Sequence, residues 1–493
     1  MRTRPTPRLA RPTAAVTLRL VGAMLGSMML GCVTMLGGVM LVGAAFARPP
    51  AEGAAPRPHS GSQEPRQPGA SAGDSGVPSG PNQLASIGAD QTQAIQVHPS
   101  IWLALGFGNS FLITTDAGNV VVDTSLPFHA RRHKRLFEAV SSEPVRTIVV
   151  THGHGDHRGG IPIWQDGTIE VIAQREYAEL VHYQTRLRGF FAARNAAQFG
   201  APASGGGIAR AVTADGAASP VTRQAAIDAT VLFDERHDFE LGGVRFELHH
   251  TPGETYDHLA VWIPEWKVAF VGDNFYGSFP NLYTLRGTKP RWALDYVDSL
   301  DQVLSWEPEL VLPSHGMPVR GRDEVRRRLT RYRDAILYVH DATVRGMNEG
   351  KDVFTLMREI SLPPELEVGE GYGAVAWSVR GIYEGYAGWY DGEASSLYSW
   401  PRSAVSAELA ALAGGAEPIS RRARELAAAG ELERALLLTG VALEAEPRHR
   451  ASLEVRIAIL EQLAARSANS NERGWLEHAL RAARSAVGAA EPQ

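Results

Sequence analysis

The stretch THGHGDHRGG, Thr151 to Gly160, decides how the rest of this sequence is interpreted. It places His152, His154, Asp156 and His157 within six residues, directly after an apolar run. The glycines between the histidines allow a tight turn, in which alternate side chains converge on one point. Four nitrogen and oxygen donors at this spacing indicate a cation site, and two cations fit them better than one. The alternative is a solvated polar loop with chance histidines.

The composition restricts the kind of metal site. The 493 residues include one cysteine, Cys32, which excludes an internal disulfide and a thiolate-rich zinc site. Imidazole and carboxylate groups must therefore supply the ligands. The formal net charge is -5, and no long run of Lys or Arg follows the N-terminus, so we expect no nucleic-acid partner.

The N-terminal 47 residues are typical of an export signal, because arginines precede the uncharged run Leu20 to Ala47. We expect a cleaved signal peptide and therefore a periplasmic or secreted protein. The run is long enough to span a bilayer, so an uncleaved membrane anchor is the alternative, and a lipoprotein site at Cys32 is a weaker one. Residues 48–90 are rich in Pro, Gly, Ser and Ala and predict a disordered linker.

Residues 91–321 predict one layered α/β domain. Short β-like runs with Gly and Asn turns begin near Ile95, and helices are expected at 130–142, 176–199 and 295–306. Residues 322–493 predict an all-α domain. Its helical hairpin has too few copies for a repeat solenoid, so we interpret it as a docking or dimerisation module.

Three further segments place a polar residue where an apolar run stops. HHTPGETYDH contains Glu254 and His258, FVGDN contains Asp273, and VLPSHG contains His315. Each could be a cap or turn residue when taken alone. Because a two-metal centre needs ligands from several strand ends, the segments together predict one site. Glu254 and His258 are rival ligands in the first of these segments, and His250 is a weaker candidate.

The patterns His-X-His-X-Asp-His, Thr-Pro-Gly, Gly-Asp and Ser-His-Gly, in this order, resemble the metallo-β-lactamase superfamily. The resemblance covers about residues 95–321 and implies an αββα sandwich with a dinuclear metal site between two sheets. FPNLYTLRG (279–287) and YGAVAWSVRGIYEGYAGWYDG (372–392) resemble the alkylsulfatases of that superfamily. The helices that follow resemble the dimerisation domain of that group, which implies a homodimer.

The resemblance also implies the metal ligands. Glutamate at position 254 is typical of alkylsulfatases, whereas most of the superfamily has histidine there. Asp273 stands where the alkylsulfatases have Glu and the wider superfamily has Asp, so the shorter bridge is still expected to close, although the metal spacing could differ. One metal would be held by His152, His154 and Glu254, the other by Asp156, His157 and His315, with Asp273 as the bridge.

Hydrolysis is the expected reaction class, because paired cations generate hydroxide at neutral pH and neutralise charge on an ester oxygen. Zinc is the expected metal, with iron or manganese as alternatives for these ligands. Arg286 is expected to orient sulfate, since a guanidinium fork matches a tetrahedral oxyanion. Asn281 resembles the second sulfate contact of the family. The predicted catalytic residues are therefore Asp156, Asp273 and Arg286.

The predicted function is hydrolysis of an alkyl sulfate to an alcohol and sulfate by a metal-bridged hydroxide. The alternatives are a phosphodiester, lactone or thioester hydrolase of the same fold, and a non-catalytic binding module stabilised by metal. Trp377 stands where related alkylsulfatases have histidine, so a proton donor or sulfate contact from that position is missing. The aromatic stretch from Tyr372 to Tyr390 predicts interdomain core rather than the wall of an alkyl pocket.

Overall fold

The structure is a computed structural model, and it describes residues 86–200 and 228–489. The predicted export signal, Cys32 and nearly all of the predicted linker lie outside the described residues, so they stay predictions. No helix in the described ranges is long and apolar enough to cross a membrane.

One sheet has seven strands in the order β1-β2-β3-β4-β5-β6-β7. Strands β1 to β4 form an antiparallel meander, and β4 to β7 are parallel, because the chain returns through helices between β4 and β5 and after β6. Its strands are β1 (Ile95–His98), β2 (Ile101–Ala104), β3 (Ser110–Thr115), β4 (Gly118–Val122), β5 (Val145–Val149), β6 (Glu170–Gln174) and β7 (Val231–Phe233).

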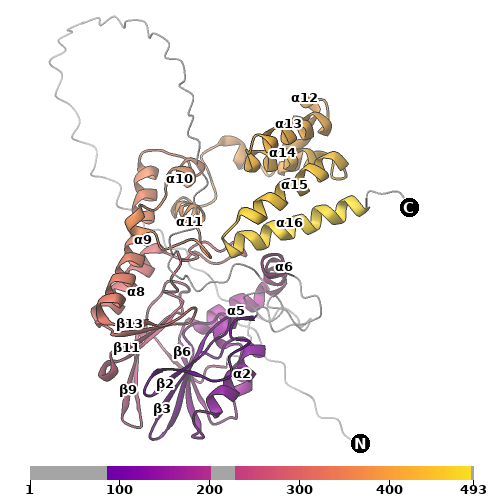
Figure 1. The fold of residues 1–493 in the computed structure, drawn as a ribbon. Coiled ribbons are helices and arrows are strands. Elements are labelled where there is room, and N and C mark those ends of the chain that lie inside the picture. Colours follow the sequence, from indigo (N-terminus) through magenta and orange to yellow (C-terminus); the bar gives the residue numbers. More distant parts are fainter. Residues whose placement is uncertain (1–85, 201–227, 490–493) are drawn as a thin grey trace, which may run out of the picture. The chain divides into compact units, whose positions relative to one another are not determined.

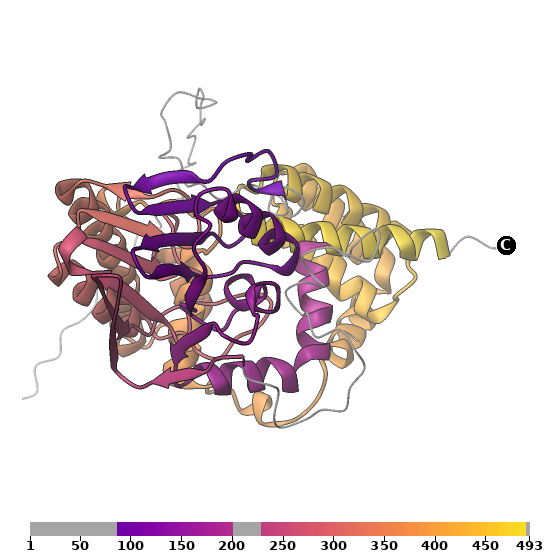
Figure 2. The ribbon, with the colours of Figure 1, turned by 90° about the horizontal axis from the view of Figure 1, so that it is seen from below.

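The other sheet has six strands in the order β13-β12-β11-β10-β9-β8. Only β11 and β12 pair in parallel in this sheet, and the remaining pairs are antiparallel. Figure 2 shows the ribbons of both sheets from below. The strands are β8 (Arg236–Leu241), β9 (Val244–His250), β10 (Leu259–Ile263), β11 (Val268–Gly272), β12 (Leu310–Pro313) and β13 (Val319–Arg320).

The central strands are apolar on both faces, because each sheet lies between the other sheet and a helical layer. In β4, Val120 and Val122 face the core between the sheets, whereas Val121 belongs to the core under the helices. Phe111 and Phe270, from the two sheets, meet edge to face with ring centroids 5.3 Å apart. These layers confirm the predicted αββα sandwich.

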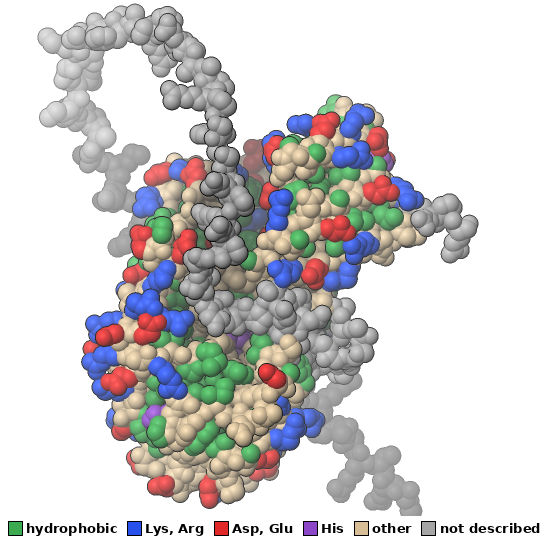
Figure 3. All heavy atoms as spheres, in the orientation of Figure 1, with side chains coloured by type: hydrophobic (Ala, Val, Ile, Leu, Met, Phe, Trp, Pro, Cys, Tyr) green, Lys and Arg blue, Asp and Glu red, His purple; other side chains and the backbone are tan. Residues whose placement is uncertain are grey.

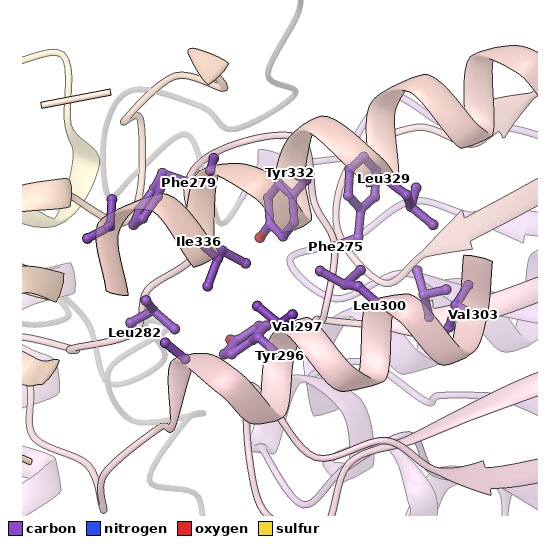
Figure 4. Packing of buried hydrophobic residues seen from close by; sticks show 14 of the residues in the cluster. Phe275, Phe279, Leu282, Tyr296, Val297, Leu300, Val303, Leu329, Tyr332 and Ile336 are labelled. Atoms are coloured by element: carbon purple, nitrogen blue, oxygen red, sulfur yellow. The ribbon is translucent and has the colours of Figure 1, made fainter. Parts of the chain in front are cut away.

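Helices cover the outer face of each sheet. On the seven-stranded sheet, α2 (Pro127–Glu138) begins three residues earlier than predicted, because Pro127 suits the first turn of a helix. On the other sheet, α8 (Ala293–Ser305) packs along α9 (Arg322–Asn348), and Figure 4 shows Tyr296, Leu300, Leu329 and Tyr332 filling the space between them. The short helices are α3 (Gly155–Arg158), α4 (Ile161–Trp164), η1 (Pro264–Trp266), η2 (Pro364–Leu366) and η3 (Ala394–Leu397).

The predicted helix at 176–199 is divided. It forms α5 (Tyr177–Arg186) and α6 (Arg188–Phe199), and the break lies at Leu187, whose φ of -103° and ψ of 17° are not helical. The two helices bury different partners: α5 packs Tyr177 on the sheet, whereas α6 contacts α16 (Ser470–Ala489). One straight helix could not serve both surfaces.

The chain after Gly321 is helical in its described part, as predicted, and Figure 1 shows these helices in orange and yellow. The core of α13, α14 and α15 consists of small and branched side chains. The prediction of interdomain core is wrong for the end of the aromatic stretch, since Trp389 is 77 % exposed. The remaining helices are α10 (Val353–Glu359), α11 (Val375–Ala387), α12 (Arg402–Ala413), α13 (Ala416–Ala428), α14 (Leu432–Ala445) and α15 (Arg450–Arg466).

Candidate metal centre

Several strands of both sheets end at a common edge, and a polar residue follows each of them. Asp123 follows β4, His152 comes shortly after β5, Asp273 follows β11, and His315 comes shortly after β12. β4 runs parallel to β5, and β11 runs parallel to β12, so their carboxyl ends lie together in each sheet. The fold therefore brings residues from distant parts of the chain to one place.

Two groups of potential metal ligands form at this edge, and within each group the ligand atoms lie within 4.8 Å of one another. Asp273 Oδ2 is 3.8 Å from His152 Nε2, 3.4 Å from His157 Nε2 and 3.1 Å from His315 Nε2. One carboxylate oxygen thus reaches members of both groups. The first group is His152, His154, Glu254 and Asp273, and the second is Asp156, His157 and His315.

The donor atoms in these groups fit divalent cations. His157 Nε2 and Asp273 Oδ1 are buried and have no hydrogen-bond partner among the described residues. His152 Nε2 and His154 Nδ1 lie only 2.8 Å apart. Buried polar atoms without partners cost stability, and a cation bound by nitrogen and oxygen donors would satisfy them.

The pKa shifts of two members of the cluster, His152 and Asp273, suit a cation. Burial lowers the pKa of the His152 imidazole well below its usual value, which favours the neutral form that binds metals. Burial raises the pKa of Asp273, but His315 and His157 outweigh that effect and hold this pKa well below its usual value. The carboxylate of Asp273 is therefore ionised at neutral pH.

His258, the rival of Glu254, uses both ring nitrogens within the protein. Its Nε2 accepts a hydrogen bond from Asp273 N at 3.1 Å, and its Nδ1 donates to Thr251 O at 3.0 Å. Gly272 has a φ of +50°, and a Cβ there would lie 2.2 Å from His258 Nε2. His258 therefore fixes the backbone at Asp273, and Glu254 rather than His258 lies among the clustered ligand atoms.

Two buried side chains donate hydrogen bonds to the carboxylate of Glu254. Arg291 Nη1 and Tyr296 OH both donate to Glu254 Oε2, and Arg291 Nη1 also donates to Asn281 O at 2.9 Å. The weaker candidate His250 hydrogen-bonds a backbone carbonyl outside both groups. Sequence reasoning missed Arg291 and Tyr296, because neither belongs to a motif or ends an apolar run.

Asp123, which sequence reasoning missed as a site residue, accepts four hydrogen bonds next to the clustered ligands. Its Oδ1 accepts from Thr151 N at 2.8 Å, and its Oδ2 accepts from Thr151 Oγ1, His157 Nδ1 and Ser314 Oγ at 2.8 to 2.9 Å. Its bond to Nδ1 orients the His157 ring so that Nε2 faces the other ligands. The signal for Asp123 was available, since it ends the apolar run of β4 as Asp273 ends that of β11.

Two cavities meet at the clustered ligands, and both include His154, Asp156, Glu254 and Arg286. The smaller one, of about 170 Å³, is called the apolar cavity, and its hydrophobic wall consists of Ile87, Leu105, Phe107, Phe199 and Met317. The larger one, of about 700 Å³, is called the basic cavity, and its cationic wall includes Arg131, Arg158, Arg188, Lys289 and Arg291.

The predicted substrate residues lie on the loop between β11 and α8. Arg286 borders both cavities, and its Nη1 is buried without a hydrogen-bond partner in the described chain. Asn281 is 1 % exposed, and both polar atoms of its side chain also have no partner there. Tyr372 lines the apolar cavity, but Trp377 is not among the residues that line either cavity.

Comparisons with known proteins identify the family. Residues 103–315 match the family model for the metallo-beta-lactamase superfamily, and residues 355–485 match that for alkyl sulfatase dimerisation. The chain is 30 % identical over 378 residues to the linear primary-alkylsulfatase of a Pseudomonas species, covering 74 % of this chain and 72 % of that protein. The chain belongs to the alkylsulfatase group of the metallo-β-lactamase superfamily.

Other members of this alkylsulfatase group are also similar. The (R)-specific secondary-alkylsulfatase of a Pseudomonas species is 27 % identical, over 76 % of this chain and 60 % of that protein. The solved structure of the stereoselective inverting sec-alkylsulfatase Pisa1 from Pseudomonas sp. is 24 % identical and superposes with a TM-score of 0.71, covering 80 % of this chain and 66 % of that one. The alkylsulfatase fold and the metal-dependent hydrolase class of this chain follow from these matches.

Asp123→Ala is expected to lower the affinity for divalent metal by about 10- to 100-fold, because His157 loses the hydrogen bond that orients it. Metal titration of the purified chain, followed by calorimetry, measures this change. Asp166→Ala, at an exposed turn, is the matched control and should bind metal like the wild type. Unchanged affinity in Asp123→Ala would contradict the orienting role.

Proposed function

We propose that this chain hydrolyses alkyl sulfate esters to an alcohol and sulfate at a dinuclear centre, with zinc as the metal. One observation carries the proposal: members of both ligand groups line the same cavities as Arg286, whose buried Nη1 lacks a partner in the described residues. The first group would hold one cation and the second the other, with Asp273 shared between them. When bound, such cations supply hydroxide at neutral pH and stabilise negative charge on the ester.

The protein's own side chains would select the sulfate group. Arg286 can offer a planar pair of N–H donors to two sulfate oxygens, which suits a tetrahedral oxyanion. Asn281 lies five residues earlier on the same loop, and its buried amide has an unused donor among the described contacts. Arg286 and Asn281 would therefore orient the sulfur end of the ester next to the ligand groups.

The apolar cavity would take the alkyl group. Its hydrophobic wall borders Asp156, Asp273 and His315, so an apolar chain bound there would place its ester bond beside these ligands. Burial of methylene groups favours such binding by roughly 0.8 kcal/mol for each buried CH₂. The relatives named above as primary and secondary alkylsulfatases support this substrate class.

We also propose that the chain forms a homodimer through its helical domain. Large apolar side chains are exposed just before and within α12, near the middle of that domain, among them Tyr398 at 69 %, Trp400 at 79 % and Leu412 at 86 %. Figure 3 shows hydrophobic side chains between the charged ones on the visible face of these helices. Exposed apolar groups of this size favour burial against a partner.

Asp273→Ala is expected to reduce the metal content from two cations per chain to one or none, because the shared carboxylate is lost. Elemental analysis of the dialysed protein measures the stoichiometry. Asp166→Ala again serves as the control. A variant that keeps its full metal content would contradict the bridging assignment.

Arg286→Ala is expected to lower turnover of octyl sulfate by about 100-fold or more, because a charge-assisted contact to the reacting group is lost. Turnover of a carboxylic ester, para-nitrophenyl acetate, should fall far less. Arg286→Lys keeps the charge without the fork and should recover only part of the sulfatase activity. Equal losses on both esters would count against the sulfate contact.

Light scattering across micromolar concentrations should give the mass of a dimer for the wild-type protein. Leu412→Glu places a charge on the exposed apolar surface and should shift the equilibrium toward the monomer. A wild-type protein that is monomeric throughout this range would remove the dimer proposal.

A further inference from the structure

Side chains at the start of α16 hydrogen-bond a distant segment of backbone, residues 370–373. Asn469 Nδ2 faces three carbonyl oxygens of this segment, at 2.7, 3.1 and 3.2 Å. Asn471 Nδ2 donates to the Tyr372 carbonyl at 2.9 Å, and the N and Oγ of Ser470 both donate to the Gly371 carbonyl. The side chains of Asn469 and Asn471 are buried in this contact.

Residues 370–373 lie directly against the loop that follows β11. Gly371 N donates to Ser278 Oγ at 3.1 Å. A Cβ added to Gly373 would lie 2.2 Å from Pro280 O, so the two backbones touch and Gly373 has no room for a side chain. Asn281, a proposed sulfate contact, is the next residue after Pro280.

Within residues 370–373, Tyr372 makes the contact with the proposed substrate site. Its side chain lines the apolar cavity together with Arg286 and His315. Its ring meets Tyr276 edge to face, with centroids 6.0 Å apart, and Tyr276 OH accepts a hydrogen bond from Asn281 N at 2.7 Å. The position of residues 370–373 therefore affects both the cavity wall and the backbone at Asn281.

A second route leads from α16 through α6 to the loop residue beside Arg286. Gln198 of α6 donates to Asn471 Oδ1 at 2.6 Å and accepts from Trp475 Nε1 at 3.2 Å. The guanidinium of Arg194 lies 5.2 Å from the Trp475 ring and donates to Leu285 O. The first turns of α16 thus support the substrate loop at two places, through residues 370–373 at Pro280 and through α6 at Leu285.

We propose that Asn469 and Asn471 are positioning residues of the substrate site, which act through residues 370–373 and through α6 to hold Asn281 and Arg286. The helical domain then completes the catalytic site of its own chain, in addition to any role between chains. This inference rests on the proposed sulfatase function. It concerns binding of the ester rather than binding of the metals, because neither asparagine contacts a residue of the two ligand groups.

The oxygen and the nitrogen of the Asn469 side-chain amide have different partners, so one substitution can separate helix capping from the contact with residues 370–373. Its Oδ1 accepts from Asn471 N and Glu472 N, both at 3.0 Å, and caps α16 in the ordinary way. Its Nδ2 makes the contacts to residues 370–373. Asn469→Asp keeps the capping oxygen and the shape of the side chain, but it replaces the donor with an oxygen that repels the carbonyls.

The experiment measures kcat and KM for octyl sulfate, metal content and melting temperature for the full-length protein. Asn469→Asp is expected to raise KM by about tenfold or more with a smaller change in kcat, since a lost ground-state contact acts mainly on KM. Both metals should remain bound. Gln198→Ala, which breaks the α6 route without touching the cap, should also raise KM.

Asp352→Ala is the matched control, because Asp352 caps α10 through Phe354 N and Thr355 N, and its hydrogen bonds to the described residues stay within that helix. It should lower the melting temperature and leave KM unchanged. An unchanged KM in both Asn469→Asp and Gln198→Ala would overturn the inference, as would an equal rise in KM in Asp352→Ala. A wild-type protein with no turnover of any sulfate ester would instead refute the proposed function on which the inference rests.

Discussion

The buried carboxylate of Asp123 is the constraint on which the metal centre depends. It is fully buried, and its four hydrogen bonds join the end of β4 to the turn after β5, to α3 and to the residue after β12. Hydrogen bonds to a charged group contribute about 1.5 to 3 kcal/mol each, and removing one partner leaves the others unpaired in the interior. Asp123 adopts a φ of +57°, an unfavourable backbone conformation for a residue with a side chain, so the surrounding bonds hold it there. Asp123 thus links the edge of the seven-stranded sheet to Ser314 at the edge of the six-stranded sheet.

The two parts of the site have different supports. The proposed metal ligands lie at or just after strand ends, where the sheets fix the backbone, and Asp123 and His258 fix it further. The proposed sulfate contacts lie on a loop that no sheet fixes, and this loop rests on α6 and on residues 370–373. Sites on regular elements are held more precisely than sites on loops. The proposed metal ligands and the proposed sulfate contacts are therefore held by different parts of the fold.

The sequence predicted the layers and the ligand clusters better than it predicted their supports. Glu254, Asp273 and His315 each mark the point where an apolar run gives way to polar residues, and this local signal needs no knowledge of the fold. Arg291 carries no such signal, because its partner Glu254 is 37 residues away and only the tertiary structure brings them together. Asn469 resembles any turn residue before a helix, and its contacts are nearly 100 residues away. The break at Leu187 was also hidden, since the residues on either side have similar helical periodicity and differ only in what they bury.

The hydrogen bonds between the start of α16 and residues 370–373 can form only late in synthesis of the chain. A chain leaves the ribosome from its N-terminus, so the αββα layers and all seven proposed ligands emerge well before Asn469 and Trp475. Until α16 arrives, the carbonyls of residues 370–373 have no partner there, and Arg194 has no indole ring to lie against. The nascent protein can thus assemble the proposed metal-ligand groups while the loop with the proposed sulfate contacts is still unsupported. On the proposed function, metal binding becomes possible before ester binding, and the first turns of α16 mark the transition.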